Sequence, residues 1–188
     1  LYRQAKRINE KLGDRASIAI SLHQIGAIHQ ETGALNAALK AYEKAFKIKK
    51  ELHDQAGMAS SLHNIGGIHQ QSGEYQLAME KYQQALKIYE EVGNQAGRAS
   101  ALHQIATIHQ IQGELDSSLN EYGESLRIRK LLGDRLGMAS TLHQLGMVYE
   151  DRRQFDTALR FYEESLKIKE ALGTQSGIAL SHGQLGRF

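Results

Sequence analysis

A unit of 40 residues recurs four times in this chain of 188 residues. The pair Leu22-His23 returns at Leu62-His63, Leu102-His103 and Leu142-His143, and Tyr42 returns at Tyr82, Tyr122 and Tyr162. Periods of 20–50 residues are typical of chains in which each unit buries its apolar face only by stacking on its neighbours. The repeat therefore predicts a solenoid, and it favours an extended binding surface over a catalytic pocket.

Each unit contains two amphipathic segments with the spacing of a helix face. In the first unit the earlier segment carries Ile18, Leu22, Ile25 and His29, and the later one carries Leu35, Ala38, Tyr42 and Ala45. We expect one array over residues 1–188, with full units at 14–53, 54–93, 94–133 and 134–173. Residues 1–13 match the second helix of a truncated unit, and residues 174–188 match the start of a first helix. Both ends cut through a unit, so we expect a piece of a longer array.

Glycine must provide the turns, because the chain contains no proline. Gly33, Gly73 and Gly113 lie between the two helices of a unit, and Arg153 takes this place in the fourth. The junctions before each unit are Gly13-Asp14, His53-Asp54, Gly93-Asn94, Gly133-Asp134 and Gly173-Thr174. We expect a residue with positive φ to end each helix and an Asp, Asn or Thr side chain to cap the next. Helices of about 17 residues joined by such short turns must lie antiparallel.

Small residues inside the first helices predict close helix contacts. Gly26, Gly66, Gly146 and Gly186 recur there, with Ala106 in the third unit. A glycine inside a helix costs about 1 kcal/mol relative to alanine, so its recurrence indicates a steric requirement. Gly123, Ser117, Ser118 and Ser125 weaken the second helix of the third unit, and we expect local opening to begin at residues 114–126.

The composition is that of an ordinary water-soluble chain. Lys and Arg number 23 against 21 Asp and Glu, with no basic cluster of the kind that binds nucleic acid. Cysteine is absent, no apolar run is long enough to span a membrane, and the chain starts with charged residues. We therefore predict a cytoplasmic protein without nucleic-acid or membrane partners. The lysines on the later segments, such as Lys47, Lys49 and Lys50, are interpreted as a solvated outward face.

In combination these residues resemble the tetratricopeptide repeat (TPR) family. The first unit supplies Leu22, Ile25-Gly26, His29, Gly33, Ala38, Tyr42 and Ala45 at the family's positions. The period of 40 residues exceeds the usual 34, and the family's proline is missing. The junction from Gly133-Asp134 to Gly137-Met138-Ala139 is similar to that of spindle-orientation scaffolds and of arrays attached to bacterial signalling proteins. The resemblance implies an all-α fold, a right-handed α-solenoid of antiparallel helix pairs (TPR superhelix), with no catalytic activity in the repeats.

The resemblance assigns the polar side of the first helices to a concave groove that binds peptides. Stacking would align histidines, amides and one carboxylate into columns on this side. The candidate binding residues are His23, Gln24, Gln30, His63, Asn64, Gln70, His103, Gln104, Thr107, Gln110, His143, Gln144, Met147 and Glu150. Neutral His, Asn and Gln both donate and accept hydrogen bonds, which suits a peptide backbone. If the histidines contact a ligand, its affinity should depend on pH between about 5.5 and 7.5.

Two other interpretations of the histidine column stay open. The histidines can be solvated or form hydrogen bonds between repeats, because recurrence within one chain also follows from duplication. A metal ladder is disfavoured, since packed helix axes lie 8–10 Å apart whereas Zn–N bonds measure 2.0–2.1 Å. We predict no metal and no cofactor. His29, His69 and His109 lie in the apolar stripe and are expected to replace packed aromatic residues.

Two functions follow from the sequence. The first is a protein–protein interaction scaffold that binds an extended peptide or partner segment in the concave groove. The alternative is a regulatory or sensor arm of a larger signalling enzyme, such as an ATPase, protease or transcription regulator, whose catalytic part lies elsewhere. An enzyme within these residues is not expected, because no nucleophile–base arrangement or phosphate loop occurs beyond the repeat pattern. The uncapped ends also predict end-to-end self-association.

Overall fold

The computed structural model of the chain describes residues 2–173, and it describes side chains for residues 13–173. Within this part the protein consists of helices without strands: α1 Tyr2–Glu31, α2 Leu35–Glu51, α3 Gln55–Gln71, α4 Tyr75–Glu91, α5 Gln95–Ile111, α6 Leu115–Leu132, α7 Arg135–Asp151 and α8 Phe155–Ala171. Six of them have 17 residues, as the sequence predicts, α6 has 18 and α1 has 30. The all-α class is confirmed.

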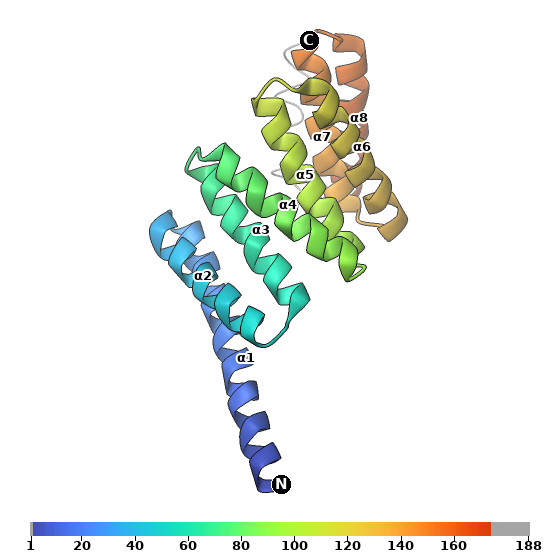
Figure 1. Ribbon diagram of the computed structural model, residues 1–188. Helices are drawn as coiled ribbons and strands as arrows, with labels where there is room; N and C mark the ends of the chain where they lie inside the picture. Colours follow the sequence, from blue (N-terminus) through green and yellow to red (C-terminus); the bar gives the residue numbers. More distant parts are fainter. Residues whose placement is uncertain (1, 174–188) are drawn as a thin grey trace. The chain divides into compact units, whose positions relative to one another are not determined.

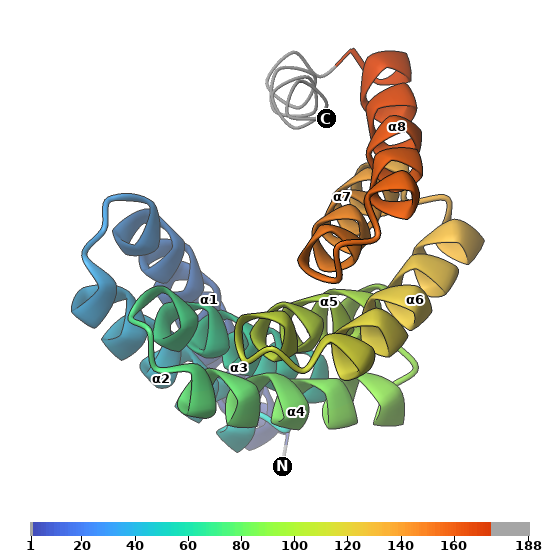
Figure 2. The same cartoon turned by 90° about the horizontal axis from the view of Figure 1, so that it is seen from above.

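The helices pack in chain order within two compact units, Leu1–Asn94 and Gln95–Phe188. In the first unit α1 packs on α2, α2 on α3, and α3 on α4 (Figure 1). In the second unit α5, α6, α7 and α8 follow the same order, and Figure 2 shows each helix beside the next. This tandem packing of helix pairs is that of an α-solenoid. The single array over residues 1–188 stays a prediction, and residues 174–188 lie outside the described part.

The predicted positive φ is confirmed at every described turn except the one expected at Gly13, and the predicted caps are confirmed at Asp54 and Asp134. Positive φ occurs at Gly33, Gly73, Gly93, Gly113, Gly133 and Gly173, and at the two exceptions, His53 (56°) and Arg153 (58°). Asp54 and Asp134 cap α3 and α7, because each carboxylate accepts the backbone N–H three residues later at 2.9 Å. A left-handed residue followed by an acidic cap therefore links these successive repeats.

The break predicted at Gly13-Asp14 is wrong, because α1 runs without interruption from Tyr2 to Glu31. Gly13 does not take positive φ there. Glycine also adopts helical φ, and a helix that continues keeps the backbone hydrogen bonds that a turn would give up. The same dipeptide type thus ends a helix at Gly133 and lies inside one at Gly13.

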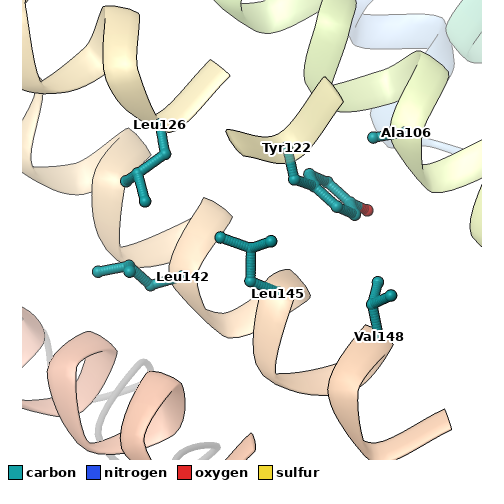
Figure 3. Packing of buried hydrophobic residues seen from close by; sticks show 6 residues of the cluster. All are labelled: Ala106, Tyr122, Leu126, Leu142, Leu145 and Val148. Atoms are coloured by element: carbon teal, nitrogen blue, oxygen red, sulfur yellow. The ribbon is translucent and has the colours of Figure 1, made fainter. Parts of the chain in front are cut away.

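Four tyrosines, one in each repeat, form the centre of the packing. Tyr42, Tyr82, Tyr122 and Tyr162 are at most 1% exposed. In the second unit, Tyr122 of α6 lies between Ala106 of α5 and Val148 of α7 (Figure 3). Because each of these large rings is almost fully buried, the four tyrosines contribute much of the apolar stabilisation between helices.

The glycines of the first helices make room for these rings, which confirms the predicted steric requirement. A Cβ on Gly26, Gly66 or Gly146 would lie 2.7, 2.9 or 2.6 Å from the ring of the tyrosine in the same repeat. Gly186 lies outside the described residues. The third repeat has Ala106 at this position, and its tyrosine hydroxyl bonds differently, as shown below.

The predicted core stripe is not buried in the first repeat. Of its residues, Ile18 and Ile25 are 44% and 45% exposed, and Ile28 beside them is 59% exposed. Their equivalents Ile65 and Ile68 are 5% and 2% exposed, because Leu35, Leu39 and Phe46 of α2 pack against them. Burial of this stripe therefore depends on the second helix of a preceding repeat, and no described helix takes that place on α1.

Candidate functional site

In each unit the candidate site is the same side of its two first helices, which we call the first-helix face. It comprises the recurring positions His23, Ala27 and Gln30 in the first repeat, His63, Gly67 and Gln70 in the second, His103, Thr107 and Gln110 in the third, and His143, Met147 and Glu150 in the fourth. Each histidine ring packs against the tyrosine ring of its own repeat, with centroids 5.1–5.3 Å apart. The buried tyrosine of each repeat thus packs beneath the histidine of the first-helix face.

The tyrosine hydroxyl holds the polar residue at the end of the first helix. Tyr42 and Tyr82 donate to Oε1 of Gln30 and Gln70 at 3.1 and 2.8 Å. Tyr162 donates to Oε2 of Glu150 at 2.7 Å. Each amide or carboxylate is half-buried and has one oxygen occupied. The arrangement fixes one recurring polar side chain per repeat in these three repeats.

The third repeat departs from this arrangement. The hydroxyl of Tyr122 lies 2.8 Å from Oγ1 of Thr107 instead of Gln110. Gln110 donates through Nε2 to Asp151 of the next repeat at 2.8 Å. Thr107 offers a hydroxyl where the other repeats have Ala27, Gly67 and Met147, so Tyr122 bonds to Thr107 and Gln110 bonds to the next repeat instead.

Hydrogen bonds between repeats involve two of the histidines. Nε2 of His23 lies 3.1 Å from Nδ2 of Asn64, and Nδ1 of His103 lies 3.2 Å from Oγ1 of Thr141. His103 and His143 are only 8% exposed. His103 and His143 therefore lie beneath the surface of the first-helix face. The two contacts support the interpretation that histidines form hydrogen bonds between repeats of one unit. Binding of a ligand by these histidines stays a prediction.

Burial also changes the expected titration of the column. Desolvation lowers the pKa of His63 to about 4. It also lowers the pKa of His23 and His143, with a smaller contribution from nearby Lys49 and Lys169. The pH range of about 5.5–7.5 expected from the sequence is therefore too high for His63, which stays neutral through it, and burial shifts His23 and His143 in the same direction.

Lys49, which the sequence assigns to the solvated outward face, is instead buried at 7% exposure. Its Nζ donates to Oγ of Ser61 in the next repeat at 3.2 Å, and burial lowers its pKa. A Cβ on Gly57 would lie 2.8 Å from Cδ of Lys49, and one on Gly137 would collide with Arg129. The sequence signal for this contact was the recurring junction glycine, which leaves room for a long cation from the preceding helix.

The histidines of the apolar stripe are partly buried, as expected for packed side chains, but two of them also bind carboxylates. Nδ1 of His69 lies 2.6 Å from Glu74, and Nδ1 of His109 lies 2.7 Å from Glu121. Among the described residues, no group of three or more His, Asp or Glu side chains is arranged to hold a metal ion. Between residues 2 and 173, no helix is long and apolar enough to cross a membrane.

Most candidate residues lie where the sequence places them, within each unit. Gln30, Asn64, Gln70, Gln104, Thr107, Gln110, Gln144, Met147 and Glu150 are half-buried on the first helices, and Gln24 is exposed. Sequence reasoning missed three features: the tyrosine hydroxyls that bind the polar side chains, the buried Lys49 that bonds to Ser61, and Asp151 as the partner of Gln110. The 40-residue recurrence of tyrosine beside that of histidine was the available signal for the first of these.

Comparison with known families decides the relationship. The family model described as tetratricopeptide repeat matches residues 17–91 and 97–171. The chain belongs to the tetratricopeptide repeat family. Each match covers two repeats, and together they include most of the described TPR helices. No curated protein sequence matches this TPR chain.

Solved TPR-like structures share the fold at low sequence identity. BtubC (BKLC) from P. vanneervenii has a TM-score of 0.78 and 19% identity over 98% of this chain and 80% of its own. Aspartyl phosphate phosphatase F from Bacillus subtilis has a TM-score of 0.84 and 10% identity, over 89% of this chain and 44% of its own. MamA has a TM-score of 0.62 and 19% identity, over 82% and 80%. At these identities the likeness concerns the fold alone.

Proposed function

We propose that the protein binds an extended peptide segment of a partner protein along the first-helix face of a unit. Tetratricopeptide repeats are in general protein-interaction scaffolds without catalytic activity. The observation that carries the proposal is the hydrogen bond from a buried tyrosine to Gln30, Gln70 or Glu150. Because these side chains are already oriented, a ligand would not have to pay for ordering them on binding.

The chemistry of the oriented side chains suits a peptide backbone. In Gln30 and Gln70 the tyrosine occupies Oε1, which leaves the amide NH₂ group to donate. Gly67, beside Gln30 and Tyr82, lets a backbone approach the helix, since it carries no side chain. We therefore infer that carbonyl groups of a bound segment accept hydrogen bonds from these amides.

The test uses peptides selected from a random display library on the folded protein. Gly67→Arg and Met147→Arg would fill the face in the first and second unit, respectively. We expect each to reduce the affinity for selected peptides at least tenfold. Gly67→Ala and Met147→Ala are matched controls, because a Cβ on Gly67 has no contact closer than 3.6 Å. Peptides that bind the arginine variants as well as the wild type would contradict the proposal.

A regulatory arm of a larger signalling protein is the second candidate. One observation favours it: the helices align with only 44% of the Bacillus subtilis phosphatase, so this fold occurs there as part of a longer chain. Both candidates use the same binding face. The sequence of the gene on either side of these 188 residues distinguishes them.

A further inference from the structure

The fourth repeat differs from the others at the end of its first helix. Gln30, Gln70 and Gln110 are neutral amides, whereas the equivalent residue is Glu150. The next residue is Asp151, so α7 ends in two carboxylates. A helix carries partial negative charge at its C-terminus, and acidic side chains there add to that charge instead of offsetting it. This end of α7 therefore attracts cations more strongly than the ends of α3 and α5, which have no acidic residue in their last two positions.

The nearest basic residue in sequence does not offset this charge. Arg152, which directly follows α7, forms an ion pair with Asp116 of α6. Asp151 accepts a hydrogen bond from the amide of Gln110, which is a neutral donor and does not cancel the negative charge. Among the described residues, no basic side chain forms an ion pair with Glu150. A half-buried carboxylate without a positive partner is costly, so it provides a strong acceptor for an incoming cation.

One carboxylate oxygen of Glu150 is left to accept a hydrogen bond from a ligand. Tyr162 donates to Oε2 of Glu150 at 2.7 Å, which fixes the carboxylate and leaves its other oxygen without a bond to any described residue. His143, which is 8% exposed, packs against the same tyrosine ring, with its centroid 5.2 Å from that of Tyr162. Nδ1 of His143 is buried and has no hydrogen-bond partner among the described residues. Nδ1 of His23 and His63 is buried and unpartnered in the same way, so the acceptor that distinguishes this position is the second carboxylate oxygen of Glu150.

From this arrangement we infer that the C-terminal end of α7 is a subsite for a positively charged side chain, Lys or Arg, of the bound segment. The inference rests on the proposed function, because it assigns a partner chemistry to one position of the first-helix face. The carboxylate of Glu150 pairs with the ligand cation, and Asp151 adds negative potential. The equivalent positions of the first two repeats, with Gln30 and Gln70, take neutral acceptors of the ligand instead.

The test is a coupling measurement with peptides selected from a random library on the wild-type protein. Selected peptides should be enriched in Lys or Arg at one position, and replacing that residue with norleucine should weaken binding about tenfold, as for the loss of one charged hydrogen bond. In Glu150→Gln the same replacement should have no effect. This variant keeps an acceptor for Tyr162, as Gln30 and Gln70 do for Tyr42 and Tyr82. Glu163→Gln, an exposed change of equal charge on α8, should retain the full tenfold effect.

The outcomes separate this inference from the proposed function. Peptides that lose affinity in Met147→Arg but show no coupling between their cation and Glu150 would overturn the subsite and leave the binding face intact. The subsite is supported if replacing the peptide's cation has the same effect in Glu163→Gln as in the wild type and loses its effect only in Glu150→Gln. A failure to select any peptide, or selection of peptides indifferent to Met147→Arg, would overturn both.

Discussion

Ser118 provides a sharp test of how the third repeat is stabilised. Its side chain is completely buried, and Oγ has no hydrogen-bond partner among the described residues. The equivalent residues Ala38, Ala78 and Ala158 are also completely buried, so an alanine fits this position without a cavity. Removing an unpaired buried hydroxyl recovers about 1–3 kcal/mol, and the higher helix propensity of alanine adds about 0.5 kcal/mol. We expect Ser118→Ala to raise the free energy of unfolding by about 2 kcal/mol.

Ser125 is the matched control on the same helix. It is equally buried, but its hydroxyl donates to the carbonyl of Ala99 at 2.8 Å. Its oxygen also accepts from Nε of Arg129 at 3.3 Å. Ser125→Ala loses both hydrogen bonds, of which the first contributes about 1 kcal/mol, and gains about 0.5 kcal/mol of helix propensity, so we expect destabilisation of about 1 kcal/mol. Urea unfolding followed by circular dichroism measures both variants, and the melting temperature of Ser118→Ala should rise by about 5 °C. Equal effects of the two substitutions would refute the reasoning.

Four further predictions concern the tyrosine row, a turn, titration and local opening. Gly66→Ala should destabilise the protein by about 1 kcal/mol or more in urea unfolding, because the new Cβ would lie 2.9 Å from the ring of Tyr82. Arg153→Gly should stabilise it by about 1 kcal/mol, since φ is 58° there, and an unchanged midpoint would argue against strain at this turn. Because the pKa of His63 is lowered to about 4, its contribution to stability is complete above pH 6.5 and is lost as pH falls toward 4, by about 3 kcal/mol at most. His63→Gln should remove this part of the pH dependence, and parallel curves for both proteins would contradict it. Amide exchange should be fastest, among the second helices, at residues 114–126; protection equal to the others would disprove this.

The repeat period predicts the fold well, because the same recurring residues specify the helices, the turns and the stacking of repeats. The spacing of Ile, Leu and Ala defines the helices, glycine defines the turns, and stacking follows from apolar faces that no single repeat can bury. Gly13 shows where this reasoning fails. A Gly-Asp dipeptide permits a turn but does not force one, so the local sequence alone cannot distinguish an interrupted α1 from a continuous one.

The candidate site is less predictable, because a helical wheel shows on which side of a helix a residue lies but not how deeply neighbouring helices bury it. His23 and Gln30 share one side of α1, yet the equivalent histidines His103 and His143 are buried beside tyrosines of the following helix. Lys49 shows the same limit, since a long aliphatic chain can follow an apolar surface and bury its charged end against Ser61. Contacts between helices, which decide both cases, are absent from the pattern of any one helix.

The most direct test of the account is a map of the bound peptide on the protein. Chemical-shift changes in ¹H–¹⁵N spectra should be followed during titration with a selected peptide. We expect the largest changes on the first helices, around the side-chain amides of Gln30 and Gln70 and the backbone near Met147 and Glu150. Largest changes on the exposed side of the second helices, around Lys47 or Arg127, would contradict binding at the first-helix face.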